Sequence, residues 1–441
     1  MRRTSATLLF LALFVPYSYF NHSDGWNQGV RLAELHALVL KGTLRIDDYI
    51  SYTGDRALID GHYYSEKAPA IVLAALPPFA VTVGLQKAIG LDPDAPPATR
   101  WSEWITTVLS IGILTALGGV AFYALLVELF DALTAVVATF ALFLGSITFP
   151  YATSLFAHAG TVGLIAIALW GAVGAASRRR DVLAGLAAGF AVASEYPAIF
   201  PGAAIGLYLA SRDPKRMLRY GLATVPAAAL ILLNNYAISG SPFKLSYGEN
   251  PLFPELSAST SYGFNAPDPA IMRAVLWGEY RGLVFWSPVA LMAIPGFIDM
   301  ARKNRGLAIM TASGCALLLL QVAAFYSWFG GNAIGPRYLA SALPLIGLAA
   351  AFGIKRFPEV GIVLTLVSIA LMGMVTAIAI DPPQDVLTPL QSFYLPRIDQ
   401  GRWADNLGTL LGLPLSLSLV VPAAFAAAAA WRLLKEPRVP A

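Results

Sequence analysis

Long apolar runs separated by short charged segments constrain the fold of this chain more than any other feature. A helix needs about 20 apolar residues to cross the hydrocarbon core of a bilayer. Charged residues make up only 13% of the 441 residues, whereas soluble domains carry about 25%. That content is too low to cover a water-soluble globule, and the aliphatic and aromatic content excludes a disordered chain. The sequence therefore predicts an all-α polytopic transmembrane helical bundle, a single integral membrane domain over residues 1–441.

Twelve apolar runs are candidate spans, and a thirteenth is ambiguous. The twelve are Thr4–Phe20, Trp104–Leu126, Ala132–Thr148, Gly160–Ala176, Val182–Ala193, Ala198–Ala210, Leu218–Tyr236, Leu283–Met300, Leu307–Phe325, Leu339–Gly353, Gly361–Ile380 and Leu407–Trp431. The thirteenth, Pro69–Ile89, contains Pro77-Pro78 at its middle. The bundle is thus expected to have about 12–13 spans.

Clusters of Lys and Arg indicate whether the thirteenth run crosses. If Pro69–Ile89 does not cross, all the basic clusters fall on the side of Arg2-Arg3, which is the simpler arrangement under the positive-inside rule. The clusters are Arg178–Arg180, Arg212/Lys215/Arg216, Arg302/Lys303/Arg305, Lys355-Arg356 and Arg432/Lys435/Arg438. We therefore expect Pro69–Ile89 to be a helix in or dipping into the outer interface, broken by its prolines. A full span, with another helix miscounted later, is the alternative.

This topology places both termini in the cytoplasm of a bacterial inner membrane and the long loops outside. The first outer region covers residues 21–100 and the second long outer loop covers 239–282. The outer loops carry most of the acids and all four histidines, so we expect any chemistry on the outer face. Within the first region, the pattern of Gly29–Lys41 predicts a short amphipathic helix that lies flat on the interface and ends at Gly42.

Two motifs in the first outer region resemble those of a known superfamily. They are Arg31-Leu32-Ala33-Glu34 on the flat helix and Glu66-Lys67-Ala68-Pro69 before the thirteenth run. Their order after one span resembles the GT-C glycosyltransferases, in particular the branch of lipid A aminoarabinose transferases and protein O-mannosyltransferases. Downstream, Ser194-Glu195-Tyr196-Pro197 and the segment Tyr326–Tyr338 resemble bacterial membrane proteins grouped with that superfamily.

The resemblance implies a sugar donor linked to polyprenyl phosphate, and transfer with inversion to a lipid, glycan or protein acceptor on the outer face. The phosphate of such a donor lies at the interface, where a basic side chain can neutralise it. Lys67 is the candidate that binds the donor phosphate, with Arg100 and Arg337 assisting. Arg31 and Glu66 are further site candidates.

The catalytic base is the point at which the sequence departs from this branch. An aspartate precedes the helix arginine by three residues in those enzymes, whereas this chain has Gln28, which cannot take up a proton. Asp24 and Asp55 are the two candidates for the base, and the sequence does not separate them. Glu34 is a weaker candidate, because it can pair with Arg31 or Lys41 along the helix.

Two further residues interrupt apolar surroundings. Glu195 lies at a membrane boundary, where a carboxylate is costly, so it either faces a functional cavity or pairs with an arginine that braces the bundle. His158 lies at the outer end of a span and is more typical of a hydrogen-bonded structural residue than of a ligand.

Other chemistries lack their sequence signatures. The histidines do not share metal-ligand spacing, so no metal site and no cofactor are predicted. The net charge of +4 is attributed to the topology-setting loops and to an anionic ligand rather than to nucleic acid. The expected partners are the polyprenyl-phosphate-linked donor, its acceptor and membrane lipids. A transporter or flippase of a lipid-linked substrate, and a catalytically inactive GT-C-like protein, remain as alternatives.

Overall fold

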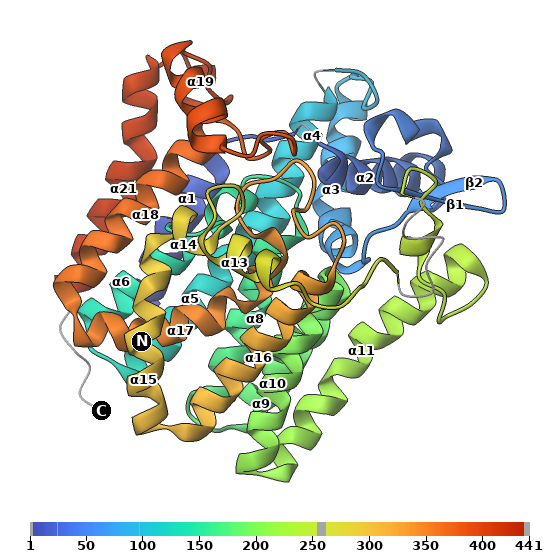
Figure 1. Ribbon diagram of the computed structural model, residues 1–441. Helices are drawn as coiled ribbons and strands as arrows, with labels where there is room; N and C mark the ends of the chain where they lie inside the picture. The colour runs from blue at the N-terminus through green and yellow to red at the C-terminus, as the bar shows by residue number, and fades with distance from the viewer. Residues whose placement is uncertain (1–2, 24, 97, 254–261, 436–441) are drawn as a thin grey trace.

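The computed structural model describes residues 3–23, 25–96, 98–253 and 262–435, and it is a helical bundle (Figure 1). The helices are α1 (Arg3–Tyr19), α2 (Trp26–His36), α3 (Ala70–Ala88), α4 (Ala98–Thr107), α5 (Ile113–Leu129), α6 (Ala132–Phe143), α7 (Thr148–Ala152), α8 (Ala157–Val173), α9 (Arg178–Ser194), α10 (Ile199–Arg212), α11 (Pro214–Ser239), α13 (Pro269–Trp277), α14 (Leu283–Trp286), α15 (Ala293–Lys303), α16 (Arg305–Ala324), α17 (Leu343–Arg356), α18 (Pro358–Ile378), α19 (Leu395–Asp399), α20 (Leu407–Leu410) and α21 (Leu415–Lys435). Short 3₁₀ or π turns include η1 (Ala37–Lys41), η2 (Asp47–Tyr52), η3 (Val108–Gly112), η4 (Tyr196–Ala198), η5 (Ser246–Glu249), η6 (Pro288–Met292) and η7 (Arg337–Ala342). The prediction of an all-α membrane bundle is confirmed.

Seven helical stretches in the described part are long and apolar enough to cross a membrane, so the chain is a multi-pass membrane protein. They are Ala70–Ala88, Ala98–Leu129, Pro214–Ser239, Arg305–Ala324, Arg337–Arg356, Pro358–Ile378 and Leu415–Lys435. Other predicted spans are shorter helices, such as α6, α8 and α10. The predicted span Leu283–Met300 is wrong as a single helix: it divides into α14, η6 and α15 at Pro288, which cannot continue a helix.

The described basic clusters lie together at one end of the bundle, which we call the basic face. Ion pairs join the clusters of different helices: Arg180 with Glu128 at 2.7 Å, and Lys355 with Asp131 at 2.7 Å. Further pairs are Arg356–Asp299, Arg216–Asp181 and Arg219–Asp181. Because Tyr19, at the end of α1, contacts Ser418, near the start of α21, these two helices are antiparallel, and the start of α1 and the end of α21 lie at this face. The clusters therefore group on one side, as predicted.

The opposite end of the bundle carries α2, and we call it the α2 face. The prediction that prolines break Pro69–Ile89 is wrong, since α3 continues through Pro77-Pro78. Both ends of α3 nevertheless lie at the α2 face: Lys67, before it, is bonded to Asp55, and Asp94, after it, is bonded to His36 at the end of α2. This position agrees with the expected interfacial helix, although its length alone would suffice for a span.

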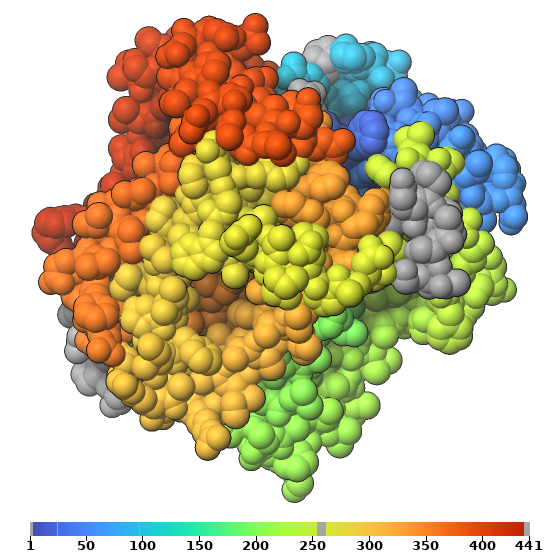
Figure 2. All heavy atoms as spheres, viewed as in Figure 1, coloured from blue at the N-terminus to red at the C-terminus, as the bar shows by residue number. Residues whose placement is uncertain are grey.

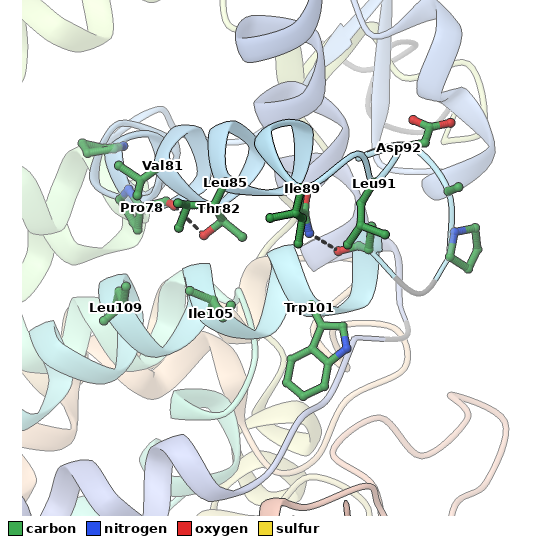
Figure 3. Close-up of a pocket in the computed structure, with 15 residues that line it drawn as sticks. Pro78, Val81, Thr82, Leu85, Ile89, Leu91, Asp92, Trp101, Ile105 and Leu109 are labelled. Atoms are coloured by element: carbon green, nitrogen blue, oxygen red, sulfur yellow. Dashed lines mark hydrogen bonds between the residues drawn. The ribbon is translucent and has the colours of Figure 1, made fainter.

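Helix α3 and the following α4 form a hairpin with an apolar groove between them (Figure 3). Val81 and Leu85 of α3, with Ile89 directly after it, line one side of this groove of about 700 Å³, and Trp101 and Ile105 of α4 line the other. The lining is almost entirely carbon, and an exposed apolar surface of this kind suits contact with lipid rather than water. From this hairpin, α4 and α5 continue as one helical stretch towards the basic face.

The first outer region is more compact than the sequence predicts. Helix α2 and η1 end at Gly42 in a left-handed conformation, as expected, but α2 is buried around its whole circumference instead of lying flat with a polar face in water. A β-hairpin of β1 (Arg56–Ile59) and β2 (His62–Ser65) follows, with Asp60 and Gly61 at positive φ in its turn. An Asp-Gly pair between β-prone residues is the standard signal for such a turn, and the sequence interpretation missed it.

Small residues allow the helices to pack closely. A Cβ at Gly118 would lie 2.2 Å from the Gly163 Cα, so α5 and α8 touch along their backbones. In the same way the end of η6 meets α17, where a Cβ at Gly353 would lie 2.0 Å from the Met292 carbonyl oxygen. Such contacts between small residues are typical of helices that associate in membranes.

In Figure 2 the segments from about 262 to 340, yellow to orange, cover the front of the bundle between the N-terminal and C-terminal segments.

Candidate functional site

Charged side chains from distant parts of the chain meet at the α2 face. We call the group the α2-face cluster, and its members are Arg31, Glu34, Asp55, Glu66, Lys67, His158, Glu195 and Arg337. They come from α2, the loop before β1, the turn before α3, the first turn of α8, the break between α9 and α10, and η7. Each of these residues was a candidate from the sequence, and the fold brings them together.

Lys67 lies between two carboxylates. Its Nζ is 2.9 Å from Asp55 Oδ2 and 2.6 Å from Glu66 Oε1, and Glu66 is buried. Burial lowers the pKa of Lys67, but Asp55 and Glu66 outweigh it and raise the pKa above its usual value, so Lys67 is a cation at neutral pH. Burial of the Glu66 carboxyl raises its own pKa. Lys67 is therefore held in place by two carboxylates from the same segment of the chain, Asp55 and Glu66.

Two residues of the segment that follows α11 complete this part of the site, and sequence analysis missed both. The Asn250 side-chain amide donates to Glu66 Oε2 at 2.7 Å and to the Gly54 carbonyl at 3.0 Å. The Tyr247 ring lies 5.4 Å from Lys67 Nζ, in the range of a cation–π contact. The loop after α11 is thus fixed across the Glu-Lys turn. No local sequence signal marks these residues, because their partners are at least 180 positions away.

Glu195 is the second centre of the cluster. Pro197 ends α9, so Glu195 takes an extended backbone conformation at the break before α10. Its Oε1 lies 3.1 Å from His158 Nδ1 and 3.8 Å from Arg31 Nη2. Burial raises the pKa of Glu195, but His158, Arg31 and Lys67 outweigh it and lower the pKa to about 2. Glu195 is therefore an anion that joins α2 to α8.

Arg31 and Glu34 of α2 are both almost inaccessible, at 1% and 4% exposure. Arg31 Nη1 donates to the Asn27 carbonyl at 2.7 Å, so the first turn of α2 orients the guanidinium towards Glu195. Burial raises the pKa of Glu34 to about 7, against the opposing effects of Ser65 and Arg31. A large fraction of Glu34 is consequently protonated at neutral pH, unlike Glu195.

Arg337 faces the cluster from η7. It contacts the rings of Phe156 and Tyr338, and its Nη2 lies 3.3 Å from the Tyr338 hydroxyl. Its buried Nε has no hydrogen-bond partner among the described residues. A Cβ at Gly330 would lie 2.5 Å from this Nε, so only glycine allows the preceding loop to approach the guanidinium. Arg337 thus has donor capacity available for a ligand.

Arg281 is a third functional candidate that the sequence interpretation missed. It is buried, and its guanidinium donates to the carbonyls of Phe329 and Gly331 at 2.9 Å each. These two carbonyls flank Gly330, so Arg281 fixes the turn that packs on Arg337. A signal was present in the sequence, since Arg281 is a charge beside an apolar run.

The remaining predicted site residues are elsewhere. Arg100 lies outside the cluster, on the surface, where it is 58% exposed and pairs with Asp405 at 2.6 Å. Asp24 falls outside the described residues. Among the residues that the structure describes, no three His, Cys, Asp or Glu side chains are grouped as a metal site would need.

Comparison with known proteins follows from this geometry. No family model matches the chain, and no curated protein matches it either. Two solved structures of ArnT, the lipid A aminoarabinose transferase of Cupriavidus metallidurans, are similar to it. The structure bound to undecaprenyl phosphate has a TM-score of 0.50 and 16% identity, and the apo structure has 0.52 and 15%. In both cases the match covers 98% of this chain and 75% of the other.

The resemblance inferred from the two short motifs therefore extends along nearly the whole chain at the level of the fold. ArnT is a helical membrane enzyme of the GT-C class. The chain thus has the fold of the ArnT structures, with its buried charged cluster at the α2 face.

Proposed function

We propose that this protein is a membrane glycosyltransferase that takes a sugar from a polyprenyl-phosphate-linked donor. The acceptor would be a lipid, glycan or protein on the outer face of the cytoplasmic membrane. The observation that carries the proposal is the convergence of Arg31, Lys67 and Arg337 at one end of a bundle with the ArnT fold. One ArnT structure is bound to undecaprenyl phosphate, a ligand with this anionic head group.

The cations would serve the departing phosphate. When the bond between the sugar and the phosphate breaks, negative charge grows on the phosphate, and preorganised cations stabilise it. Arg337 has an unpartnered Nε for this purpose. Lys67 is already paired with Asp55 and Glu66, so a bound phosphate must compete with these carboxylates for Nζ. We therefore assign Arg337 the larger share of phosphate binding and Lys67 the smaller.

A base must also take up the proton of the acceptor hydroxyl. Of the two carboxylates expected to do so, Asp55 lies in the cluster, bonded to Lys67. An acceptor that attacks from the side opposite the phosphate would invert the configuration of the sugar.

The test uses the full-length protein in lipid nanodiscs. Binding of undecaprenyl phosphate is measured by a thermal-shift titration, and transfer by release of undecaprenyl phosphate from radiolabelled undecaprenyl-phosphate hexoses and aminopentoses, with bacterial lipid extract as acceptor. We expect Arg337→Met to weaken binding at least 10-fold and Lys67→Met to weaken it less. Lys41→Met is the matched control, because Lys41 is an exposed cation of the same outer region.

One result would refute the glycosyltransferase proposal. If the wild-type protein binds undecaprenyl phosphate but transfers none of the sugars, the glycosyltransferase proposal is wrong. If it then moves a fluorescent polyprenyl phosphate between leaflets of proteoliposomes, it is a transporter of lipid-linked substrates.

A further inference from the structure

Next to Arg337 the cluster encloses a small polar cavity. His158, Glu195, Arg337 and Ser341 line it, together with Thr161 and the Tyr338 ring. Its size allows about one water molecule, which is too small for a phosphate or a sugar. His158 and Ser341 are 3% and 4% exposed. His158 Nε2, Ser341 Oγ and Arg337 Nε lack hydrogen-bond partners in the described part of the chain.

Buried polar groups without partners are costly, and several of them around one cavity indicate a site built for a polar guest. A single water molecule usually needs two to four polar partners, and this cavity supplies that number. The guest would lie beside the imidazole of His158, a side chain that can take up or release a proton.

Within the described residues, three buried histidines have an Nε2 without a hydrogen-bond partner, and their surroundings differ. The His22 Nδ1 contacts the Thr153 hydroxyl at 2.8 Å. The His36 Nδ1 contacts Asp94 at 2.8 Å, but its ring packs among Tyr49, Tyr52 and Phe79. Of these three, only His158 combines a carboxylate at Nδ1 with a polar cavity and a cation.

We propose that His158, oriented by Glu195, is the general base of the transfer reaction and receives the proton of the acceptor hydroxyl through the water molecule in this cavity. The inference rests on the proposed function. Glu195, 3.1 Å from Nδ1, favours the tautomer with the proton on Nδ1 and leaves Nε2 as the acceptor. A carboxylate fixed behind an imidazole also stabilises the imidazolium that forms.

The atoms balance as follows. The acceptor oxygen forms a bond with the anomeric carbon, and the bond from that carbon to the phosphate oxygen breaks. The electron pair leaves with polyprenyl phosphate, beside Arg337. The acceptor proton passes to the water molecule, which gives one of its own protons to His158 Nε2. Asp55 then serves to hold Lys67, which is its contact in the structure, and is not the base.

Charged and titratable groups from several elements face His158. They are Glu195 from the end of α9, Arg31 from α2, Arg337 and Tyr338 from η7, and Tyr151 from α7. Burial has the largest effect and lowers the pKa of His158; Glu195 opposes this effect, and the two arginines add to it. Because these arginines would be neutralised by a bound phosphate, donor binding would strengthen His158 as a base.

The experiment compares His158→Ala with His22→Ala in the transfer assay, using the undecaprenyl-phosphate sugar that the wild-type protein accepts. We expect His158→Ala to lower kcat by about 10²- to 10⁴-fold, the usual contribution of a general base. Its affinity for undecaprenyl phosphate should change less than about 3-fold, which also shows that the variant folds. Added imidazole should restore at least a tenfold increase in rate for His158→Ala and none for His22→Ala.

A second variant, Glu195→Gln, keeps the size of the side chain but removes its charge. We expect its pH–rate profile to move to lower pH, because the imidazolium loses its anionic partner. Retention of more than a third of wild-type kcat by His158→Ala, or a loss that imidazole does not rescue, would overturn the inference and leave the proposed function standing. Absence of transfer by the wild-type protein would refute both.

Discussion

The buried carboxyl of Glu34 makes the stability of this protein depend on pH in a direction opposite to that of most paired carboxylates. Its pKa is about 7 in the folded protein, against 4.5 for an ordinary glutamate. Between these two pH values the folded chain binds more protons than the unfolded chain, so stability falls as pH rises. A pKa difference of this size corresponds to about 3 kcal/mol in the free energy of unfolding. The folded protein has lost this full amount of stability at pH 8, where Glu34 is ionised in both states.

Substitution Glu34→Gln removes the titration and keeps the shape. At pH 5 the variant and the wild type should be similarly stable, whereas at pH 8 the variant should be more stable by about 3 kcal/mol. For a chain of this length that difference corresponds to roughly 3 °C in Tm. The assay is thermal unfolding of the purified protein in detergent at pH 5, 6, 7 and 8, followed by tryptophan fluorescence.

The control is Glu249→Gln, which removes a partly exposed glutamate from the same face, paired only with Lys244. Its Tm difference from the wild type is the baseline against which the Glu34→Gln difference is compared. If the Glu34→Gln difference stays constant from pH 5 to pH 8, or decreases, then Glu34 is ionised in the folded protein and the argument from its burial fails.

Three further perturbations follow from contacts in the structure. Gly353→Ala should lower Tm by several degrees, because its Cβ would lie 2.0 Å from the Met292 carbonyl oxygen; Gly373→Ala, which meets open space, should not. Asn250→Ala removes two buried hydrogen bonds, a loss of about 2 kcal/mol, and should speed proteolytic cleavage of the loop after α11 in a time course followed by mass spectrometry. Arg100→Ala breaks an exposed ion pair and should change stability by less than about 1 kcal/mol and leave undecaprenyl phosphate binding unchanged; weaker binding would return Arg100 to the phosphate site.

Features that depend on neighbouring residues in the chain were predictable from the sequence. The apolar runs determined the helical bundle, and the basic clusters determined which helix ends lie together, because both follow from composition and spacing. The Glu-Lys turn was identifiable because Asp55, Glu66 and Lys67 lie within one short segment. The same reasoning overestimated how strongly Pro77 and Pro78 would disrupt α3. The helix continues through both prolines, and it packs on α2 and α9.

Features that depend on distant partners were not predictable. Glu34 and Arg31 have the sequence pattern of a surface helix, and only the packing of η2, the β-hairpin and α3 around α2 makes them buried. Asn250 and Arg281 act on residues about 180 and 50 positions away. The pairing of His158 with Glu195 was visible only as two separate interruptions of apolar sequence, and the structure shows that they meet.

The ion pair between Arg31 and Glu195 also has a consequence for synthesis. Lys67 finds its carboxylates within a dozen residues of itself, so its charge is balanced as soon as this segment leaves the ribosome. Arg31 must wait for Glu195, which is made 164 residues later. At about 5–20 residues per second this interval is roughly 10–30 s. During that time Arg31 lacks this partner, and the ion pair can form only after α8 and α9 have been made.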